Sequence, residues 1–331
     1  MAILAIYPQP PYLHLALNHC GQLISTKMLF SDPNSLEIDE LIFRWLAENS
    51  APQNSLEIIV TSGIYVSPAP SGLYLLNQSF LKNTTAYSQP ENYGALVAQR
   101  LTHALGIPAY IVDPLERGEI PLQAAVTGTP ELKRNNKADV FVFKYVTRAE
   151  AQKRKIPWER SRFVVANLNE ELQIGAVSQG RIVDLTNSQD EGPFSLQQAG
   201  GLPFGPVLEL SARLANEERT LQVLEKESGI RGYIGAKSYA ELFQSKDSRA
   251  QLIAEALVYQ VAKEIGAYAA VLRGRTDGIV LTGDLAREKT FLAFLRKRIE
   301  FLGDLAFYPG NQAFPALLAG AQRVKEQQKS I

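Results

Sequence analysis

The stretch FVVANLNEELQIGAVSQGRIVDL, residues 163–185, decides the fold class. Short apolar runs alternate there with turn-forming residues, and this pattern predicts an antiparallel meander of three strands. The predicted strands are Phe163–Leu168, Leu172–Ser178 and Arg181–Leu185. Residues 3–30 carry the same pattern at the start of the chain, with Gly21 placed as Gly180 is in the second meander. This repetition predicts a duplicated chain.

Helices and further strands follow each meander. After the first meander, the apolar spacing predicts a helix over 36–48 with Asn34 or Ser35 as its N-cap, a strand over 56–60, a helix over 93–105 and a strand over 109–112. After the second meander it predicts a helix over 248–272, a strand over 278–282, a helix over 285–301 and a terminal helix over 313–326. The predicted class is α/β, with two related domains of mixed sheets flanked by helices and a cleft between them.

The basic segment KRKIPWER, residues 153–160, is the expected domain boundary. Runs of this kind are more often solvated linkers than nucleic-acid sites. The two predicted domains are therefore residues 1–152 and 153–331, with the terminal helix able to pack back on the first domain.

The composition excludes several classes of partner and site. Lys plus Arg and Asp plus Glu both number 34, so no net charge attracts nucleic acid or an anionic membrane. Cys20 is the only cysteine, which excludes an internal disulfide and a cysteine metal cluster. The first apolar run is too short for a signal peptide or a membrane span before Pro8 interrupts it. We expect a soluble, cytoplasmic protein that binds neither nucleic acid nor membrane.

Specific segments carry a family resemblance. DEGPFSLQQAGGLP, residues 190–203, resembles the butyrate kinase stretch that runs Asp-Gly-Glu-Gly-Pro-Phe-Ser and closes Gly-Gly-Leu-Pro. Four further segments are similar to butyrate kinases in the same order and spacing, namely residues 106–115, 256–272, 277–286 and 307–324. Over essentially its whole length the chain therefore resembles the acetate and butyrate kinase family.

The resemblance implies a fold and a reaction. The fold would be that of the sugar kinase and actin superfamily, with two duplicated RNase H-like domains. The reaction would move the terminal phosphoryl group between ATP and a short carboxylate such as butyrate, using Mg²⁺, with catalysis resting on phosphate clamping and charge neutralisation. The resemblance also implies a homodimer formed through the second domain, and the alanine-rich helix over 254–272 permits close packing.

Six positions retain residues that the resemblance assigns to the site. Asp113 and Arg134 would be catalytic, and the nucleotide-binding residues would be Gly175, Gly235, Thr282 and Gly283. Asp113 follows a buried strand at its carboxyl end, where α/β proteins usually bind ligands. Thr282 and Gly283 precede a predicted helix, so a purely structural turn is the alternative there. No metal ligand is assigned.

The two turns that hold phosphate in the family differ here. The first family turn, Asn-Pro-Gly-Ser-Thr-Ser-Thr-Lys, corresponds to YPQPPYLH at Tyr7–His14, where added prolines remove backbone donors and tyrosines fill the space. The second family turn, His-Leu-Gly-Gly-Gly-Ile-Ser, corresponds to NLNEELQ at Asn167–Gln173. Glu170 and Glu171 would repel a polyphosphate. An acid/base pair of these two glutamates is disfavoured, because adjacent strand residues point to opposite faces.

The family's other clamp residues are also replaced. Its two arginines fall at Ser62 and Gln198, and its acidic residue on the metal side falls close to Ala313. Its histidine corresponds to Asp139, and its Gly-Thr-Asn-Asp segment resembles residues 235–238 only at the glycine. None of these replacements offers a bidentate cationic fork.

Three hypotheses follow for the function. The first is a catalytically impaired butyrate kinase-like protein that acts as a scaffold or a regulatory paralogue, associated with an active acyl kinase. The second is a working kinase for butyrate or another short-chain carboxylate. The third is a repurposed pocket for a less anionic small molecule, with Tyr7, Tyr12 and Tyr65 as aromatic walls.

Overall fold

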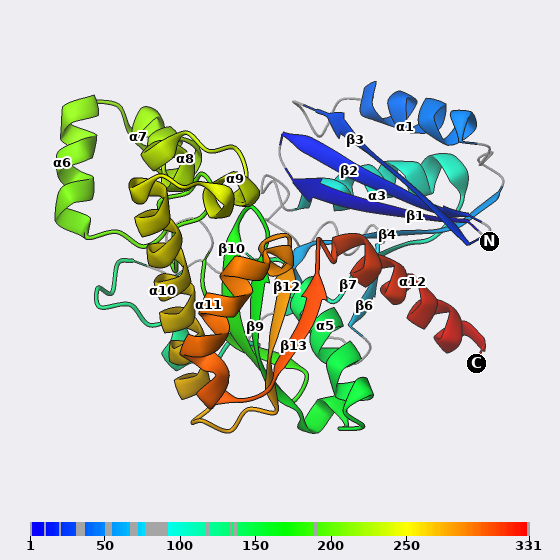
Figure 1. The fold of residues 1–331 in the computed structure, drawn as a ribbon. Helices are drawn as coiled ribbons and strands as arrows, with labels where there is room; N and C mark the ends of the chain where they lie inside the picture. Colours follow the sequence, from blue (N-terminus) through cyan, green and yellow to red (C-terminus); the bar gives the residue numbers. More distant parts are fainter. Residues whose placement is uncertain are drawn as a thin grey trace. The chain divides into compact units, whose positions relative to one another are not determined.

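The structure is a computed structural model with two compact units (Figure 1). It describes residues 2–9, 11–19, 21–30, 37–49, 55–66, 72–76, 92–116, 119–132, 134, 138–187 and 191–329. The first unit comprises Met1–Glu119, Val140–Tyr145 and Ala313–Ile331, and the second comprises Ile120–Asp139 and Val146–Gln312. The division into folding domains at residues 152 and 153, and the cleft between domains, stay predictions.

The first unit is built on a six-stranded sheet with the order β3-β2-β1-β4-β7-β6. These strands are β1 (Ala2–Gln9), β2 (Tyr12–His19), β3 (Gln22–Leu29), β4 (Leu56–Thr61), β6 (Leu73–Leu75) and β7 (Ala109–Val112). The meander β1-β2-β3 is antiparallel, whereas β1, β4 and β7 run parallel. Interior β1 is buried along almost its whole length, and edge strand β3 alternates between exposed and half-buried side chains. A separate parallel pair joins β5 (Ile64–Val66) to β8 (Leu115–Glu116).

Helices cover both faces of this sheet. They are α1 (Glu37–Glu48), α3 (Tyr93–Leu105) and α12 (Ala313–Lys329). Ile111 packs in the core cluster that includes α3, whereas a Cβ at Gly320 of α12 would lie 2.4 Å from Val112 Cγ1. Because neighbouring strand residues point to opposite faces, α3 and α12 lie on opposite sides of β7.

The second unit repeats the same strand order, β11-β10-β9-β12-β13. Its strands are β9 (Arg162–Leu168), β10 (Leu172–Ser178), β11 (Arg181–Leu185), β12 (Gly278–Gly283) and β13 (Leu305–Pro309). Again the three meander strands are antiparallel, and β9, β12 and β13 run parallel. Strands β9 and β12 are buried on both faces, as continuous apolar runs predict. The predicted duplication of an RNase H-like sheet is confirmed.

The helices of this part of the chain are more numerous than the sequence analysis predicted. They are α4 (Leu122–Ala125), α5 (Val140–Lys153, whose first six residues belong to the first unit), α6 (Phe204–Leu214), α7 (Glu217–Lys226), α8 (Gly229–Ile234), α9 (Tyr239–Gln244), α10 (Ser248–Val271) and α11 (Lys289–Ile299), with single 3₁₀ turns at Trp158–Arg160, Leu285–Arg287 and Glu300–Leu302. The core cluster of this unit joins Ile279 and Leu281 of β12 to α10 and α11. Figure 1 shows α10 and α11 side by side along the sheet.

Two sequence predictions are corrected. The predicted helix over 285–301 is divided, because Glu288 has an extended backbone with φ −78° and ψ 103° between the first 3₁₀ turn and α11. Helix α5 (Val140–Lys153) was not predicted. Asp139 stands at its N-cap position, where aspartate is a common residue. The proposed caps of α1, Asn34 and Ser35, lie outside the described residues. Within the described ranges, every helix is too short or too polar to cross a bilayer.

The close pairing of β10 with β11 predicts that a methyl group added at Gly175 lowers stability. Gly175 pairs with Leu185, and a Cβ at Gly175 would lie 2.7 Å from both the Asp184 carbonyl oxygen and Leu185 Cβ. Gly175→Ala should therefore lower the free energy of unfolding by roughly 1–3 kcal/mol, measured by chemical denaturation. The matched control is Gly266→Ala in α10, whose Cβ would meet no atom within 4 Å and which should raise stability by up to about 1 kcal/mol. Equal stability of the two variants would contradict this packing.

Candidate functional site

The turn between β9 and β10 is held by side-chain amides. Asn167 and Gln173 face each other across the hairpin and are 1% and 5% exposed. Asn167 Nδ2 donates to Gln173 Oε1 at 3.1 Å. The same oxygen accepts the backbone N–H of Asp139 at 3.0 Å, so Gln173 ties the hairpin to the start of α5.

Asn169 extends this set toward β12. Its Nδ2 donates to Asn167 Oδ1 at 2.9 Å, and its Oδ1 accepts the backbone N–H of Asp284 at 3.2 Å. Its backbone carbonyl accepts the hydroxyl of Tyr239 at 3.0 Å. We call the side chains of Asn167, Asn169 and Gln173, with the N–H groups of Asp139 and Asp284, the amide chain. It joins the β9–β10 turn to the residue that follows β12.

The two residues before Asp284 lie at the same edge. Gly283 has φ +95°, and a Cβ there would lie 2.3 Å from the carbonyl carbon of Leu168. Glycine is therefore required for the close approach of β12 to the hairpin. Thr282 is fully buried, and its Oγ1 has no hydrogen-bond partner among the described residues. The nucleotide contacts assigned to Thr282 and Gly283 stay predictions.

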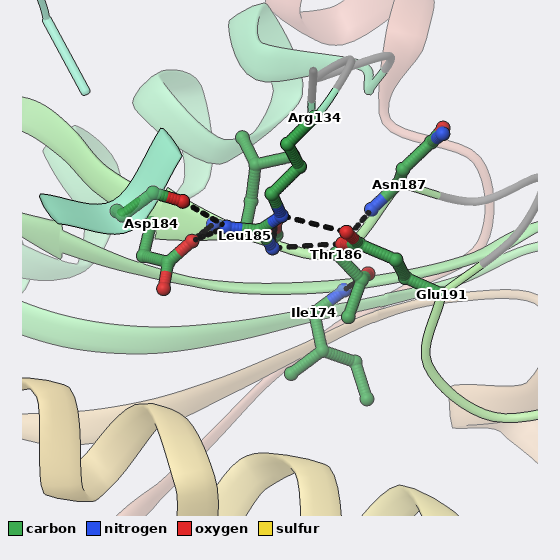
Figure 2. A network of polar contacts seen from close by, with 8 residues as sticks. Arg134, Ile174, Asp184, Leu185, Thr186, Asn187 and Glu191 are labelled. Atoms are coloured by element: carbon green, nitrogen blue, oxygen red, sulfur yellow. Dashed lines mark hydrogen bonds and ion pairs between the residues drawn. The ribbon is translucent and has the colours of Figure 1, made fainter. Parts of the chain in front are cut away.

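Arg134 lies in a network of its own in the second unit (Figure 2). Its Nε and Nη2 donate to the two carboxylate oxygens of Glu191 at 2.6 and 2.7 Å. Nη1 donates to Asp184 Oδ1 at 2.6 Å and to the carbonyl oxygen of Ala124 at 2.8 Å, and Nη2 also donates to the carbonyl of Leu185 at 2.6 Å. All five N–H groups of the guanidinium are thus engaged. A catalytic role for Arg134 stays a prediction, and it would require some of these bonds to break.

The electrostatics of this network favour the ion pairs. The hydrogen bond to Glu191 is the largest cause of a raised pKa for Arg134, opposed by burial and supported by Asp184. Two side chains of α10 titrate in the same surroundings. Burial raises the pKa of Glu264, and burial raises the pKa of Tyr268. The network therefore holds one cation fixed against two carboxylates.

Asp113 is neutralised within the first unit. Asp113 is the first residue after β7. Its backbone has φ +43°, and its side chain is 3% exposed. Arg323 of α12 binds it with both terminal nitrogens, Nη1 to Oδ1 at 3.2 Å and Nη2 to Oδ2. The bidentate pair gives Asp113 a structural partner, and its predicted catalytic role stays untested.

The first turn carries an aromatic cluster. The ring of His14 lies 6.1 Å from that of Tyr7 and 6.3 Å from that of Tyr12. Tyr7 also packs edge-on against Phe141 at 5.8 Å, and Lys27 Nζ lies 4.8 Å from the centre of the Tyr12 ring. Burial, followed by the charge of Lys27, lowers the pKa of His14. The side chain of Tyr65 lies outside the described residues.

The remaining predicted positions are distributed over the two units. Gly175 and Arg134 both contact the Asp184–Leu185 segment of β11, whereas Gly235 ends α8 with φ +69° and open space around it. Where the family resemblance would put arginines, Ser62 is 7% exposed, and Gln198 is 5% exposed with its Oε1 accepting from Ser195 Oγ at 3.3 Å. Ala313 is buried at the start of α12.

Among the described ranges, no three His, Cys, Asp or Glu side chains come together as a metal site. Asp113, the carboxylate expected nearest the site, already binds Arg323. Mg²⁺ is often held by only one or two carboxylates together with water and substrate phosphates, so the use of Mg²⁺ stays a prediction.

Comparison with known proteins decides the family. The model of the acetokinase family matches residues 138–306. "Probable butyrate kinase 2" of Caldanaerobacter subterraneus subsp. tengcongensis is 32% identical over 88% of this chain and 84% of its own length. The chain belongs to the acetokinase family. "Butyrate kinase 2" of Clostridium acetobutylicum is 31% identical over 88% of this chain and 84% of its own length.

The solved structures agree on the fold of this family member. Acetate kinase of Porphyromonas gingivalis superposes with a TM-score of 0.79 at 14% identity, covering 98% of this chain and 99% of that one. At this identity the likeness shows the fold alone. The relatives confirm the predicted resemblance to acetate and butyrate kinases, and the superposition confirms the fold class.

Sequence reasoning missed several residues that shape these sites. Tyr239 and Arg323 were not singled out, and Asn169 and Gln173 were noted only as members of the altered turn. The pattern Asn-x-Asn-x-x-x-Gln at 167–173 contained a usable signal, because amides on both sides of a tight hairpin can bond across it. Nothing in the sequence indicates Arg323, which lies 210 residues from Asp113.

The Arg134 network predicts a large loss of stability on truncation. Arg134→Met leaves Asp184 and Glu191 facing each other without their cation, so the free energy of unfolding should fall by roughly 2–4 kcal/mol in chemical denaturation. The matched control is Arg219→Met, which removes an equally bidentate pair with Glu227 on the exposed surface and should change stability little. A small effect of Arg134→Met would show that the network is not structural.

The lowered pKa of His14 predicts a pH dependence. The unfolded chain takes up a proton near the ordinary pKa of 6.5, while folded His14 resists it, so the contribution of His14 is complete above pH 6.5 and is lost as the pH falls below that value. The melting temperature should therefore fall between pH 7 and pH 5, with a shallower fall in His14→Gln. The control is His103→Gln on the exposed face of α3. An unchanged slope in His14→Gln would contradict the prediction.

Proposed function

We propose that this acetokinase family member is a butyrate kinase-like protein that does not transfer phosphate and acts as a non-catalytic scaffold or regulatory paralogue. The carrying observation is the amide chain. It occupies the turn at Asn167–Gln173, which corresponds to a phosphate-binding turn in the family, with hydrogen bonds among the protein's own groups. Side-chain amides that donate to the protein's own oxygens are less available to a polyphosphate.

Charge supports the same proposal. Glu170 and Glu171 lie at the tip of this hairpin, where they repel phosphate rather than attract it. At the first turn, Tyr7 and His14 pack in the aromatic cluster, and the lowered pKa of His14 keeps the imidazole neutral near pH 7. Neither turn supplies the fixed cation that phosphoryl transfer requires.

The two retained charged residues support it as well. Arg134 uses all of its donors on Asp184, Glu191 and two carbonyl groups, and Asp113 is held by Arg323. A transition-state donor must be directed at the reacting group, and removing one such donor typically slows turnover by about 10² to 10³. ATP and Mg²⁺ are therefore cofactors of the family that we do not assign to this chain.

A working short-chain carboxylate kinase is the second candidate. The observation that favours it is the buried, unpartnered Oγ1 of Thr282, because such a hydroxyl is expected to find a partner and a ligand could supply one. This candidate is weaker because a triphosphate needs several hydrogen-bond donors and cations, and the Thr282 hydroxyl is a single group. The identity of 32% to a protein named as a probable butyrate kinase is compatible with both candidates.

The proposal also covers the partners of the protein. A homodimer, a hetero-association with an active acyl kinase, a short-chain carboxylate or other small-molecule ligand and a cytoplasmic location are consistent with the family. A scaffold role predicts that the chain co-purifies with an intact family member when the two are expressed together. Failure to associate with any active acyl kinase would remove the regulatory version of this proposal.

Calorimetric titration with magnesium ATP, run beside an assay for acyl phosphate with butyrate, tests the proposal. We expect no binding heat up to millimolar nucleotide and no acyl phosphate, because both phosphate turns are filled. An intact family member serves as the positive control, and a cooperative thermal transition shows that the protein is folded. Micromolar to low millimolar binding with formation of acyl phosphate would overturn the non-catalytic proposal and favour the working kinase.

A further inference from the structure

A hollow of about 460 Å³ lies in the second unit, away from the amide chain. Its walls come from the loop Gly192–Pro203, from α8 and from α10, and Figure 1 shows α8 beside α10. Phe194 is 7% exposed at its base, whereas Tyr233 and Leu202 are 51% and 46% exposed at its rim. The difference in exposure indicates a pocket with a buried floor. Its volume is typical of small-molecule sites.

Two aromatic rings define the shape of the pocket. Phe194 and Tyr233 are 6.4 Å apart between ring centres, with an interplanar angle of 60°. Ile253 and Ala256 of α10 form the opposite apolar wall. A flat ring can stack on one aromatic side chain while its edge meets the other, an arrangement that aromatic groups prefer.

One polar side chain in the pocket has an unused donor. Gln260 Oε1 accepts the backbone N–H of Phe194 at 3.2 Å, which fixes the orientation of the amide. Its Nε2 donates to none of the described residues. A ligand carbonyl or ring nitrogen placed against the aromatic pair would therefore meet an N–H donor that is already oriented.

Glycines keep the pocket in a defined shape. A Cβ at Gly229 would lie 2.3 Å from the Ser195 carbonyl oxygen and 2.8 Å from that of Gln198. A Cβ at Gly232 would lie 2.7 Å from the Glu227 carbonyl oxygen. The backbone of α8 therefore packs directly on the loop, and the walls are set before any ligand arrives.

A larger depression of about 660 Å³ lies along α7, but its described lining residues all come from Asn216–Lys226. One helix surface without an opposing wall does not enclose a ligand. The pocket at Phe194 is enclosed by three separate segments, and for that reason it is the better site.

We propose that this pocket binds a small planar aromatic molecule that carries a hydrogen-bond acceptor, with Phe194 and Tyr233 contacting the ring and Gln260 Nε2 donating to the acceptor. The pocket shares no residue with the amide chain, the aromatic cluster or the Arg134 network. The inference therefore stands apart from the proposed loss of phosphoryl transfer.

Benzamide is the probe for the test, because it combines one aromatic ring with a carbonyl acceptor. Saturation-transfer NMR with the full chain should detect binding at millimolar benzamide, the range expected for so small a ligand. Tyr233→Ala should weaken binding by about fivefold or more, through lost ring contact. Gln260→Glu keeps the acceptor for the Phe194 N–H but removes the donor, and should weaken binding by about threefold or more.

The matched control is Tyr259→Ala. Tyr259 is 54% exposed, lies next to Gln260 on α10 and does not line the pocket, so its replacement should leave benzamide binding unchanged. Cyclohexanecarboxamide, which keeps the acceptor and lacks the aromatic ring, should bind more weakly than benzamide. The proposal is overturned if folded wild-type protein gives no saturation transfer, or if Tyr233→Ala and Gln260→Glu bind benzamide as wild type does.

Discussion

The second unit depends on the two hydrogen bonds that Gln173 Oε1 accepts. One comes from Asn167 across the β9–β10 hairpin and the other from the backbone of Asp139 before α5. Through Asn169 the same chain reaches the end of β12, where Gly283 permits backbone contact that no larger residue allows. The Asn167–Gln173 bond is buried, so breaking it would leave a polar group unpaired at a cost of about 1–3 kcal/mol. The edge formed by β9, β10 and β12 is thus held together by hydrogen bonds among the protein's own groups.

The charged residues Arg134 and Asp113 are also bonded to partners within the protein. Arg134 is matched by Asp184 and Glu191 within the second unit, and Asp113 is matched by Arg323 within the first. Fixed ion pairs of this kind stabilise one conformation but leave no field directed at a substrate, whereas catalysis requires preorganised charge aimed at the reacting atoms. Because fold does not determine function, the proposed loss of phosphoryl transfer is compatible with the fold of this family.

The meanders and the helix Tyr93–Leu105 could be predicted because apolar periodicity is local information. The division of the predicted helix over 285–301 could not, because the extended backbone of Glu288 has no strong sequence signal. The replaced phosphate turns were visible by comparison with the family, but their new contacts were not. The Asn169 to Asp284 bond spans 115 residues, and the Arg323 to Asp113 pair spans 210, so only the folded chain brings these groups together.

Hydrogen exchange of the backbone N–H of Asp139 and Asp284 measures the closure of the amide chain directly. Both groups donate to side-chain oxygens, and a backbone N–H held in a closed hydrogen bond exchanges slowly. Exchange should be slow in the protein alone and should keep the same rates after addition of magnesium ATP. Fast exchange in the protein alone, slowed by magnesium ATP, would contradict the proposed closure, because it would show that the turn is open and binds nucleotide.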